Sequence, residues 1–262
     1  MFVAVVGTEK GGAAKTMSAS NLASAWALSG LNVLAVDLDP QGQLGLSFGI
    51  TQESNPMLGD YLYQDDAQEV HKIMRGVREL PSLMVLSGTE SEMRKAEISM
   101  RSQGDGPYRV RLMLAQVEAY RSKPDVVIID TPPSLDILTV SALHACDVAF
   151  GSAIASHGAI PGVIRFAKLV TKLRQVASVV PKGYGGTIVG RCDGAERTGK
   201  DVSNVLNSAG FNVLEPLIPK SVEADRSIST GLPVTARSPS NPVSLAYRSL
   251  ADEIGKLYGF GN

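Results

Sequence analysis

Short apolar runs alternate with longer amphipathic stretches along most of this chain, and this alternation restricts the possible folds more than any other feature. Several runs are apolar on both faces, as the buried strands of parallel sheets are. The runs that we predict as strands are Phe2–Gly7, Asn32–Asp39, Ser82–Gly88, Asp125–Pro133, Asp147–Ala155, Gly186–Cys192 and Asn212–Pro219.

The stretches between these runs carry apolar residues at helical spacing. The predicted helices are Thr16–Leu28, Tyr108–Ala119, Leu138–Ala145, Gly162–Val176, Lys200–Ser208 and Val243–Tyr258. Strands that alternate with helices form a parallel sheet covered by the crossover helices. The sequence therefore predicts an α/β fold, with a doubly wound, mostly parallel sheet and helices on both faces.

We expect residues 1–262 to form a single domain, because no linker, internal repeat or low-complexity segment interrupts the alternation. A polar stretch from Thr51 to Arg78 is predicted to be a small helical excursion. The first predicted strand starts at Phe2, so we expect no separate N-terminal module.

Charge and cysteine content bear on the partners and the environment of the protein. The chain has 25 basic and 26 acidic residues, so only a local patch would favour an anionic partner. Cys146 and Cys192 have neither paired nor metal-type spacing, which fits a reducing cytosol. Without a signal-peptide pattern or an apolar run of membrane-spanning length, the expected location is cytoplasmic.

The segment GTEKGGAAKTMSASNLA, from Gly7 to Ala23, has the order strand, glycine-rich turn, Lys-Thr and helix that is typical of a phosphate-binding loop. Backbone N–H groups of such a turn and helix N-terminus point at phosphate oxygens. Lys15 would neutralise phosphate charge, and the Thr16 hydroxyl would ligate Mg²⁺. Because Glu9 and Ala14 occupy consensus glycine positions, the alternative is a turn that only connects strand and helix.

Two carboxylate-bearing segments follow predicted strands. VDLDPQGQ, from Val36 to Gln43, places Asp37 and Asp39 two residues apart at a strand end, where both side chains point the same way. They would share a network of Mg²⁺ and water, or else merely cap a turn. DVVIIDTPPSL ends its apolar run at Asp130, on the edge of the sheet where ligands bind.

These motifs together resemble the ParA/MinD superfamily of P-loop ATPases. KGGAAKT resembles its deviant Walker A motif, Lys-Gly-Gly-x-Gly-Lys-Ser/Thr, in which the position of Glu9 need not be glycine. VDLDPQGQ resembles the Asp-x-Asp-Pro-Gln-Gly motif of ParA proteins, and the DTPP block and the ending from Ile218 to Ile254 also follow the family. The chain looks like a short-form ParA-type partition ATPase, without an N-terminal helix-turn-helix domain.

The resemblance implies an ATP and Mg²⁺ site in a homodimer that sandwiches two ATP molecules. Lys10 would be the signature lysine that reaches the partner's nucleotide, Asp39 would position the attacking water, and Asp37 would support the metal shell. Lys10, Lys15 and Asp39 are thus the expected catalytic residues, and the expected metal residues are Thr16, Asp37, Asp39 and Asp130. The expected nucleotide-binding residues are Glu9, Lys10, Gly11, Gly12, Ala13, Ala14, Lys15, Thr16, Met17, Arg191 and Pro219.

The resemblance also implies binding of non-specific DNA in the ATP state, nucleoid association, and a ParB-like or cargo-adaptor partner that stimulates slow hydrolysis. The cargo would be a plasmid, a chromosome region or a protein assembly. The expected DNA-binding residues are Arg197, Lys200, Lys220 and Arg226. Glu223 replaces an arginine of many relatives, and the helical stripe Arg165, Lys168 and Lys172 is an alternative basic surface.

Three positions depart from the family pattern in or after the strands that carry its motifs. Ala14 replaces a glycine that commonly has positive φ, at a cost on the order of 1 kcal/mol, and we expect slow hydrolysis in consequence. Met17 replaces a frequent threonine. Ser152 replaces a usual proline, and we expect little consequence there.

Alternative functions remain open. A hydrolysis-impaired, nucleotide-bound scaffold would follow if Ala14 blocks catalysis. A MinD-like membrane-cycling ATPase would need a basic amphipathic tail, whereas the ending GKLYGFGN is short and weakly basic, so we expect no stable membrane anchor. A redox protein of the nitrogenase-iron-protein branch would need cysteines near the switch segments, where Cys146 and Cys192 do not fall.

Overall fold

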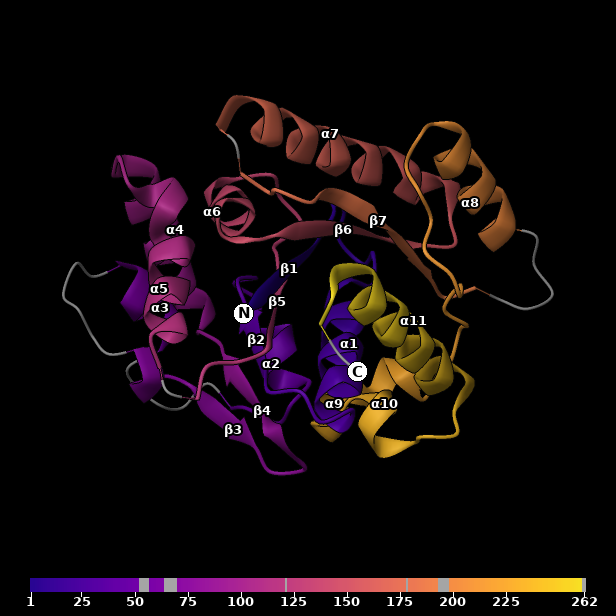
Figure 1. The fold of residues 1–262 in the computed structure, drawn as a ribbon, viewed down its shortest axis with the longest axis horizontal. Coiled ribbons are helices and arrows are strands. Elements are labelled where there is room, and N and C mark those ends of the chain that lie inside the picture. Colours follow the sequence, from indigo (N-terminus) through magenta and orange to yellow (C-terminus); the bar gives the residue numbers. More distant parts are fainter. Residues whose placement is uncertain (52–56, 64–69, 121, 178, 193–197, 261–262) are drawn as a thin grey trace.

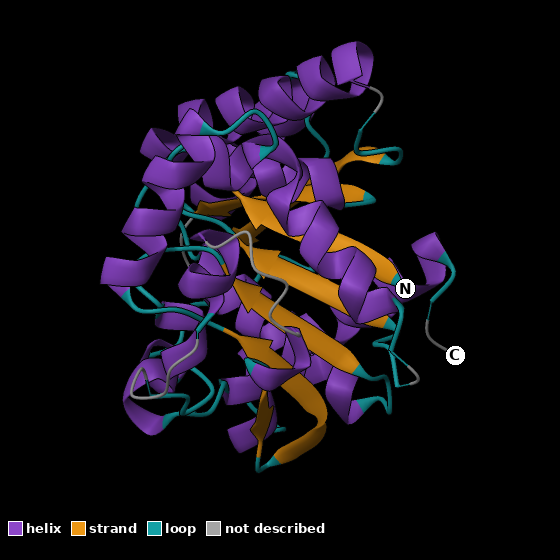
Figure 2. Ribbon diagram, turned by 90° about the vertical axis from the view of Figure 1, so that its left-hand side faces the viewer, coloured by secondary structure: helices purple, strands orange, loops and turns teal. Residues whose placement is uncertain are grey.

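The computed structural model forms one seven-stranded sheet with helices packed on its two faces (Figures 1 and 2). The residues that the structure describes are 1–51, 57–63, 70–120, 122–177, 179–192 and 198–260.

The sheet confirms the predicted fold class. Its strand order is β3-β4-β2-β5-β1-β6-β7, and all neighbouring pairs are parallel except β3 and β4. Strand β1 lies in the interior, so the chain winds outward from it in both directions. The strands are β1 (Phe2–Gly7), β2 (Val33–Asp37), β3 (Arg75–Val77), β4 (Leu80–Leu86), β5 (Val126–Asp130), β6 (Val148–Ile154) and β7 (Gly183–Gly190).

Helices connect most of these strands. The α-helices are α1 (Lys15–Leu28), α2 (Gln43–Leu46), α3 (Leu58–Tyr63), α4 (Glu90–Ser102), α5 (Arg109–Glu118), α6 (Ile137–Ala145), α7 (Ile160–Ala177), α8 (Thr198–Ser208), α9 (Ser227–Thr230), α10 (Val234–Arg237) and α11 (Pro242–Tyr258). Short 3₁₀ turns are η1 (Val70–Lys72), η2 (Gly106–Tyr108), η3 (His157–Ala159) and η4 (Ala224–Arg226).

Two hydrophobic cores cover the two faces of the sheet, because successive residues of a strand point to opposite sides. In β1, Ala4 and Val6 join the core formed with α1 and α11, whereas Val3 and Val5 join the core formed with α4 to α7. Figure 1 shows α1 and α11 on one side of the strands and α6 and α7 on the other. Both layers thus rest on strands whose two faces are apolar.

Helix α1 carries the phosphate-binding loop at its N-terminus and is enclosed almost all round. Its residues from Ser18 to Ala27 are all buried, and most of them are Ser or Ala. Such small side chains let α11 pack closely against α1 on the side away from the sheet, where Ser18 and Tyr247 share a hydrogen bond of 3.1 Å. The loop is therefore joined to a helix that has little freedom to shift.

The structure differs from what we predicted from the sequence in three segments. The segment predicted as a helical excursion, 51–78, contains α3 and η1 but also β3, which pairs antiparallel with β4 as an edge strand. Helix α4 was not predicted, although its start carries a capping box between Thr89 and Glu92 and its face buries Met93, Ala96 and Met100.

The predicted strand Asn212–Pro219 is also wrong. This segment makes only isolated bridges, Thr187 with Val213 and Cys192 with Pro219. Pro216 lies between the two bridges and has no backbone N–H, so it donates no ladder hydrogen bond.

A membrane-crossing helix is not found among the described residues, since none of their helices is both long and apolar enough.

Candidate active site

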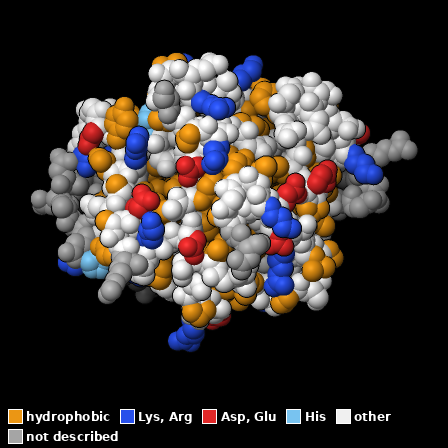
Figure 3. All heavy atoms as spheres, viewed as in Figure 1, with side chains coloured by type: hydrophobic (Ala, Val, Ile, Leu, Met, Phe, Trp, Pro, Cys, Tyr) orange, Lys and Arg blue, Asp and Glu red, His pale blue; other side chains and the backbone are white. Residues whose placement is uncertain are grey.

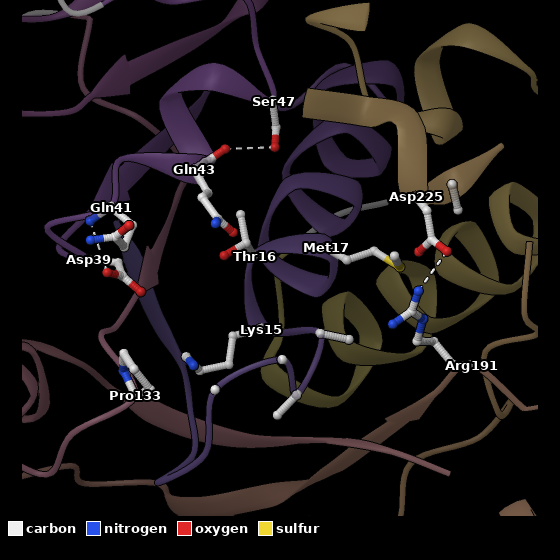
Figure 4. Close-up of a pocket in the computed structure, with 15 residues that line it drawn as sticks. Lys15, Thr16, Met17, Asp39, Gln41, Gln43, Ser47, Pro133, Arg191 and Asp225 are labelled. Carbon is white, nitrogen blue, oxygen red and sulfur yellow. Dashed lines mark hydrogen bonds and ion pairs between the residues drawn. The ribbon is translucent and has the colours of Figure 1, made fainter. Parts of the chain in front are cut away.

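A cavity of about 330 Å³ opens at the carboxyl ends of the central strands, where ligands bind in doubly wound sheets (Figure 4). One wall is the loop that joins β1 to α1. The opposite wall follows β2, and the far end lies beyond β7. The described residues that line the cavity are Gly11, Gly12, Ala13, Ala14, Lys15, Thr16, Met17, Asp39, Gln41, Gln43, Ser47, Pro133, Arg191, Ala224 and Asp225.

The loop wraps the N-terminus of α1 in the manner of a phosphate cradle. Gly12 has φ 69° and Ala14 has φ 61°, so the backbone of both residues is in the left-handed conformation. Ala14 is the N-cap of α1, and no side chain caps the helix there. The positive φ expected at this position is therefore present, and alanine occupies it against its own conformational preference.

The Lys15 side chain points into the cavity (Figure 4) and is only 6% exposed. Its Nζ donates a hydrogen bond of 3.3 Å to the Lys10 carbonyl, which folds the side chain back over the loop. Burial lowers the pKa of Lys15, while the nearby Asp130 and Asp39 carboxylates act in the opposite direction. The ammonium is therefore placed to meet a polyanion that enters between the loop and β2.

Asp130 ends β5 and is completely buried. Its Oδ2 accepts a hydrogen bond of 2.6 Å from the Thr16 hydroxyl, and its buried Oδ1 has no hydrogen-bond partner among the residues that the structure describes. Burial raises the pKa of Asp130 to about 7, although Lys15 and the Thr16 hydrogen bond act against the rise. An orphaned carboxylate oxygen beside a hydroxyl is a donor set that suits a hard cation such as Mg²⁺.

Asp37 lies beside Asp130 because β2 and β5 pair in a register that sets the two residues opposite each other. Its two oxygens accept the backbone N–H groups of Asp39, at 3.2 Å, and Gly45, at 3.0 Å. Burial, with Asp130 as neighbour, raises the pKa of Asp37 well above its usual value. Asp37 thus shapes the turn that carries Asp39, whereas Asp39 itself lines the cavity.

Comparison with known proteins identifies the family. Residues 1–179 match the model of a family described as an AAA domain. The chain is 30% identical over 257 residues to the chromosome partitioning protein ParA of Caulobacter vibrioides, across 96% of this chain and 93% of that protein. It is 32% identical over 252 residues to the chromosome-partitioning ATPase Soj of Thermus thermophilus, across 94% of this chain and 92% of Soj. The chain belongs to the ParA/MinD superfamily of ATPases.

A solved structure of a more distant relative shares the fold. Cobyrinic acid a,c-diamide synthase from Mycobacterium smegmatis, solved with a bound ATP analog and magnesium, is 25% identical and has a TM-score of 0.83. The match covers 99% of this chain and 96% of that one.

The two residues that open the ParA/MinD loop do not line the cavity. Lys10, at the signature position, donates a hydrogen bond of 2.8 Å from its Nζ to the Gly158 carbonyl in η3. Glu9 forms an ion pair with Arg165 on α7, and its backbone N–H reaches the Gly162 carbonyl at 3.4 Å. In a single chain, both side chains are thus held against α7 and the turn before it.

The far end of the cavity is bounded by an ion pair that joins two segments distant in sequence. The Arg191 guanidinium donates to the Asp225 carboxylate at 2.6 Å (Figure 4), and Arg191 has a positive φ of 57°. Pro219 does not line the cavity but bridges to Cys192, next to Arg191. Of the two expected nucleotide-binding residues in this region, Arg191 therefore lines the cavity, whereas Asp225 lines it in place of Pro219.

Sequence reasoning missed several lining residues. Gln41 and Gln43 belong to the VDLDPQGQ motif, so their presence beside Asp39 was readable from the sequence. Ser47 lies one turn further on, just after α2. Ala224 and Asp225 come from the C-terminal part of the chain, and no local motif marks them.

Three of the expected DNA-binding residues are exposed and lie outside the cavity. Lys200 lies on α8, Lys220 follows the Pro219 bridge, and Arg226 ends η4. Arg197 lies outside the described residues. Glu223, by contrast, is engaged by its own chain: it pairs with Arg237 and accepts hydrogen bonds from the side chains of Ser238 and Asn241.

Basic side chains do not gather in one patch on the face shown in Figure 3, where the described Lys and Arg side chains are interspersed with acidic ones. On α7, Arg165 is paired with Glu9, while Lys168 and Lys172 are exposed. The two basic surfaces expected from the sequence therefore lie on separate elements, α7 and the segment from α8 to η4.

Neither cysteine is among the described residues that line the cavity, although Cys192 directly follows Arg191. Cys146 is buried after α6, and burial raises the pKa of its thiol. Cys192 contacts the region of Gly199 at the start of α8.

Proposed function

We propose that the protein is a dimerising, ATP-dependent partition ATPase, in which residues 1–262 act as one P-loop domain that binds ATP and Mg²⁺. One observation carries the proposal: the glycine-rich loop and the Lys15 ammonium line one cavity, and the buried Asp130 carboxyl, with its orphaned oxygen, lies directly behind Thr16 of that lining, whose hydroxyl donates a hydrogen bond to it. Membership of the ParA/MinD superfamily supports ATP as the nucleotide.

The triphosphate would lie along the loop, with the Gly11–Thr16 backbone N–H groups and Lys15 around its oxygens. The nucleoside would extend toward Arg191 and Asp225, because these residues bound the other end of the cavity. Thr16 and Asp130 would hold Mg²⁺, and Asp39 and Asp37 would act around it. When bound, Mg²⁺ supplies positive charge to the phosphate oxygens.

Hydrolysis requires a water in line with the terminal phosphate, and Asp39 is the carboxylate that faces the cavity beside Lys15. We propose that Asp39 orients this water. Because Lys10 is tied to Gly158 in the single chain, it would reach a partner's nucleotide only after that hydrogen bond is exchanged. Hydrolysis is therefore proposed to be slow in the isolated chain and faster with a partner protein.

Replacement of Lys10 by Ala is expected to abolish ATP-dependent dimerisation while leaving nucleotide binding by the monomer nearly unchanged, because Lys10 does not line the cavity of its own chain. The mass of the protein in solution, measured by light scattering with Mg·ATP and with Mg·ADP, tests this. Lys123→Ala, at an exposed lysine, is the matched control. A dimer that ignores both ATP and Lys10 would contradict the proposed switch.

We propose that the ATP-bound dimer binds DNA without sequence preference through the segment from α8 to η4. Charge reversal at Lys200, Lys220 or Arg226 is expected to weaken binding to any duplex. Each change is also expected to reduce the slope of log affinity against log salt concentration by about the share of one phosphate contact. Fluorescence anisotropy with ATP, at several salt concentrations, measures both.

Lys168→Glu and Lys172→Glu on α7 are the matched comparison for the DNA experiment. If these variants lose DNA binding and the others keep it, the interface lies on α7 instead. If the unmodified protein retains no DNA with ATP at low salt, the DNA-binding proposal is wrong.

The proposed cellular role is to position a plasmid, a chromosome region or a protein assembly on the nucleoid of the cytoplasm, together with a ParB-like or cargo-adaptor protein. The likeness to ParA and Soj along nearly the whole chain supports this role. A second candidate, a nucleotide-bound scaffold, is favoured by the left-handed Ala14 alone. Phosphate release measured with Mg·ATP, DNA and the partner protein separates the two, since a scaffold would release none.

A further inference from the structure

Ser152, near the end of β6, contacts the phosphate loop directly. Its hydroxyl donates a hydrogen bond of 2.7 Å to the carbonyl of Ala13. Ser152 is completely buried and Ala13 is only 2% exposed, so water does not replace either group readily. The contact therefore ties the middle of the loop to β6, which is paired on both sides with β1 and β7, although the sequence led us to expect little consequence of a serine there.

The hydrogen bond sets the direction of the peptide unit between Ala13 and Ala14. In a trans peptide the carbonyl and the N–H point in opposite directions. With the Ala13 carbonyl turned toward Ser152, the Ala14 N–H points away from β6, and Ala14 lines the cavity. The donor is thus presented to the space that a phosphate would occupy.

The contact matters because of the backbone conformation of Ala14. Its φ of 61° is a conformation that residues with a β-carbon disfavour. A rotation of the Ala13–Ala14 peptide would return φ of Ala14 to negative values, and it would also turn the Ala13 carbonyl toward the cavity. A carbonyl oxygen there would repel phosphate, so the relaxed loop would bind nucleotide poorly.

The surroundings of the Ala14 methyl leave room for it. A β-carbon built on Gly190, at the end of β7, would lie 3.8 Å from the Ala14 Cβ, which is an ordinary contact distance. On the side that faces β7 the cost of Ala14 is therefore conformational rather than steric, and a contact that holds the peptide direction is able to offset it.

We propose that Ser152 is a positioning residue that holds the Ala13–Ala14 peptide in its phosphate-binding orientation and so offsets the left-handed Ala14. The inference rests on the proposed binding of ATP at this loop and is independent of DNA, dimerisation and cargo. It predicts that the importance of Ser152 depends on the residue at position 14.

A double-mutant cycle of Ser152→Ala and Ala14→Gly tests this dependence. With alanine at position 14, loss of the hydroxyl is expected to weaken Mg·ADP binding about tenfold. With glycine at position 14, the same loss is expected to change it by less than about threefold, because glycine has no preference for negative φ. The dissociation constant of a fluorescent ADP analogue and the unfolding temperature are measured for all four proteins.

Ser203→Ala is the matched control, because Ser203 is also buried and its hydroxyl also donates to a backbone carbonyl, that of Gly199, at 2.9 Å. It is expected to lower the unfolding temperature without changing nucleotide affinity. An equal loss of affinity whether alanine or glycine stands at position 14, or no loss in either case, would overturn the role of Ser152 while leaving the proposed function intact. If the unmodified protein binds no nucleotide, both proposals fall.

Discussion

Replacement of Lys15 by Met is expected to weaken ATP binding by about 100-fold or more and to reduce hydrolysis below detection, since charge-assisted hydrogen bonds to phosphate are the strongest contacts this cavity offers. Lys15 is the cation that lines the loop side of the cavity, and its side chain is buried there. Isothermal titration with Mg·ATP and a phosphate-release assay measure the two effects.

The same variant should still fold. Lys15 lowers the pKa of Asp130, so without the ammonium the Asp130 carboxyl becomes easier to protonate and no buried charge is left uncompensated. Thermal unfolding of the nucleotide-free protein checks this. Lys256→Met, at an exposed lysine on α11, is the control. A Lys15 variant that folds and binds ATP normally would contradict the assignment of the site.

Replacement of Asp130 by Asn is expected to lower Mg²⁺-dependent hydrolysis by about 100- to 1,000-fold, because the metal loses its anionic contact at the phosphates. ATP binding measured with excess EDTA should change much less, since Lys15 and the loop remain. Asp252→Asn, on the exposed face of α11, is the matched control. Unchanged hydrolysis in the Asp130 variant would show that another group holds the metal.

If Asp130 holds the metal as proposed, the binding of metal is also expected to depend on pH. Its pKa is raised from 3.8 to about 7 by burial, so the stability it adds to the nucleotide-free fold is fully present below its unfolded pKa. That stability is lost as pH rises toward 7, because the unfolded chain ionises first. Metal binding requires the ionised carboxylate and releases its proton. Mg·ADP should therefore raise the unfolding temperature more at pH 8 than at pH 6, and Asp130→Asn should remove the difference.

Much of the fold could be predicted from the sequence because strand and helix periodicities are local properties of the chain. Every strand of the sheet from β1 to β7 overlaps a predicted run except β3, which lies in a polar stretch and is held at the edge by its pairing with β4. Helix α4 was not predicted, although the capping box at Thr89 marks its start. The run Asn212–Pro219 misled the prediction because it is apolar without being paired along its length.

The candidate site could also be predicted only in part from the sequence. The residues from Gly11 to Met17 and Asp39 were predicted to lie at one site, and they line one cavity. Their motifs sit immediately after strands, and parallel strands end at a common edge. Asp225 was not foreseen, because the segment that carries it reaches the cavity only by packing the C-terminal part of the chain beside Arg191.

By itself, the sequence determined the class of fold, the loop that would hold phosphate and the carboxylates near it, since each of these depends on residues close together in the chain. Only the tertiary structure decided which residues from distant parts of the chain contact this loop and these carboxylates. The register of β2 and β5 sets Asp37 beside Asp130, the end of β6 brings Ser152 to the Ala13 carbonyl, and η3 holds Lys10 through Gly158. These contacts join residues far apart in sequence, and packing of the sheet and its helices determines them.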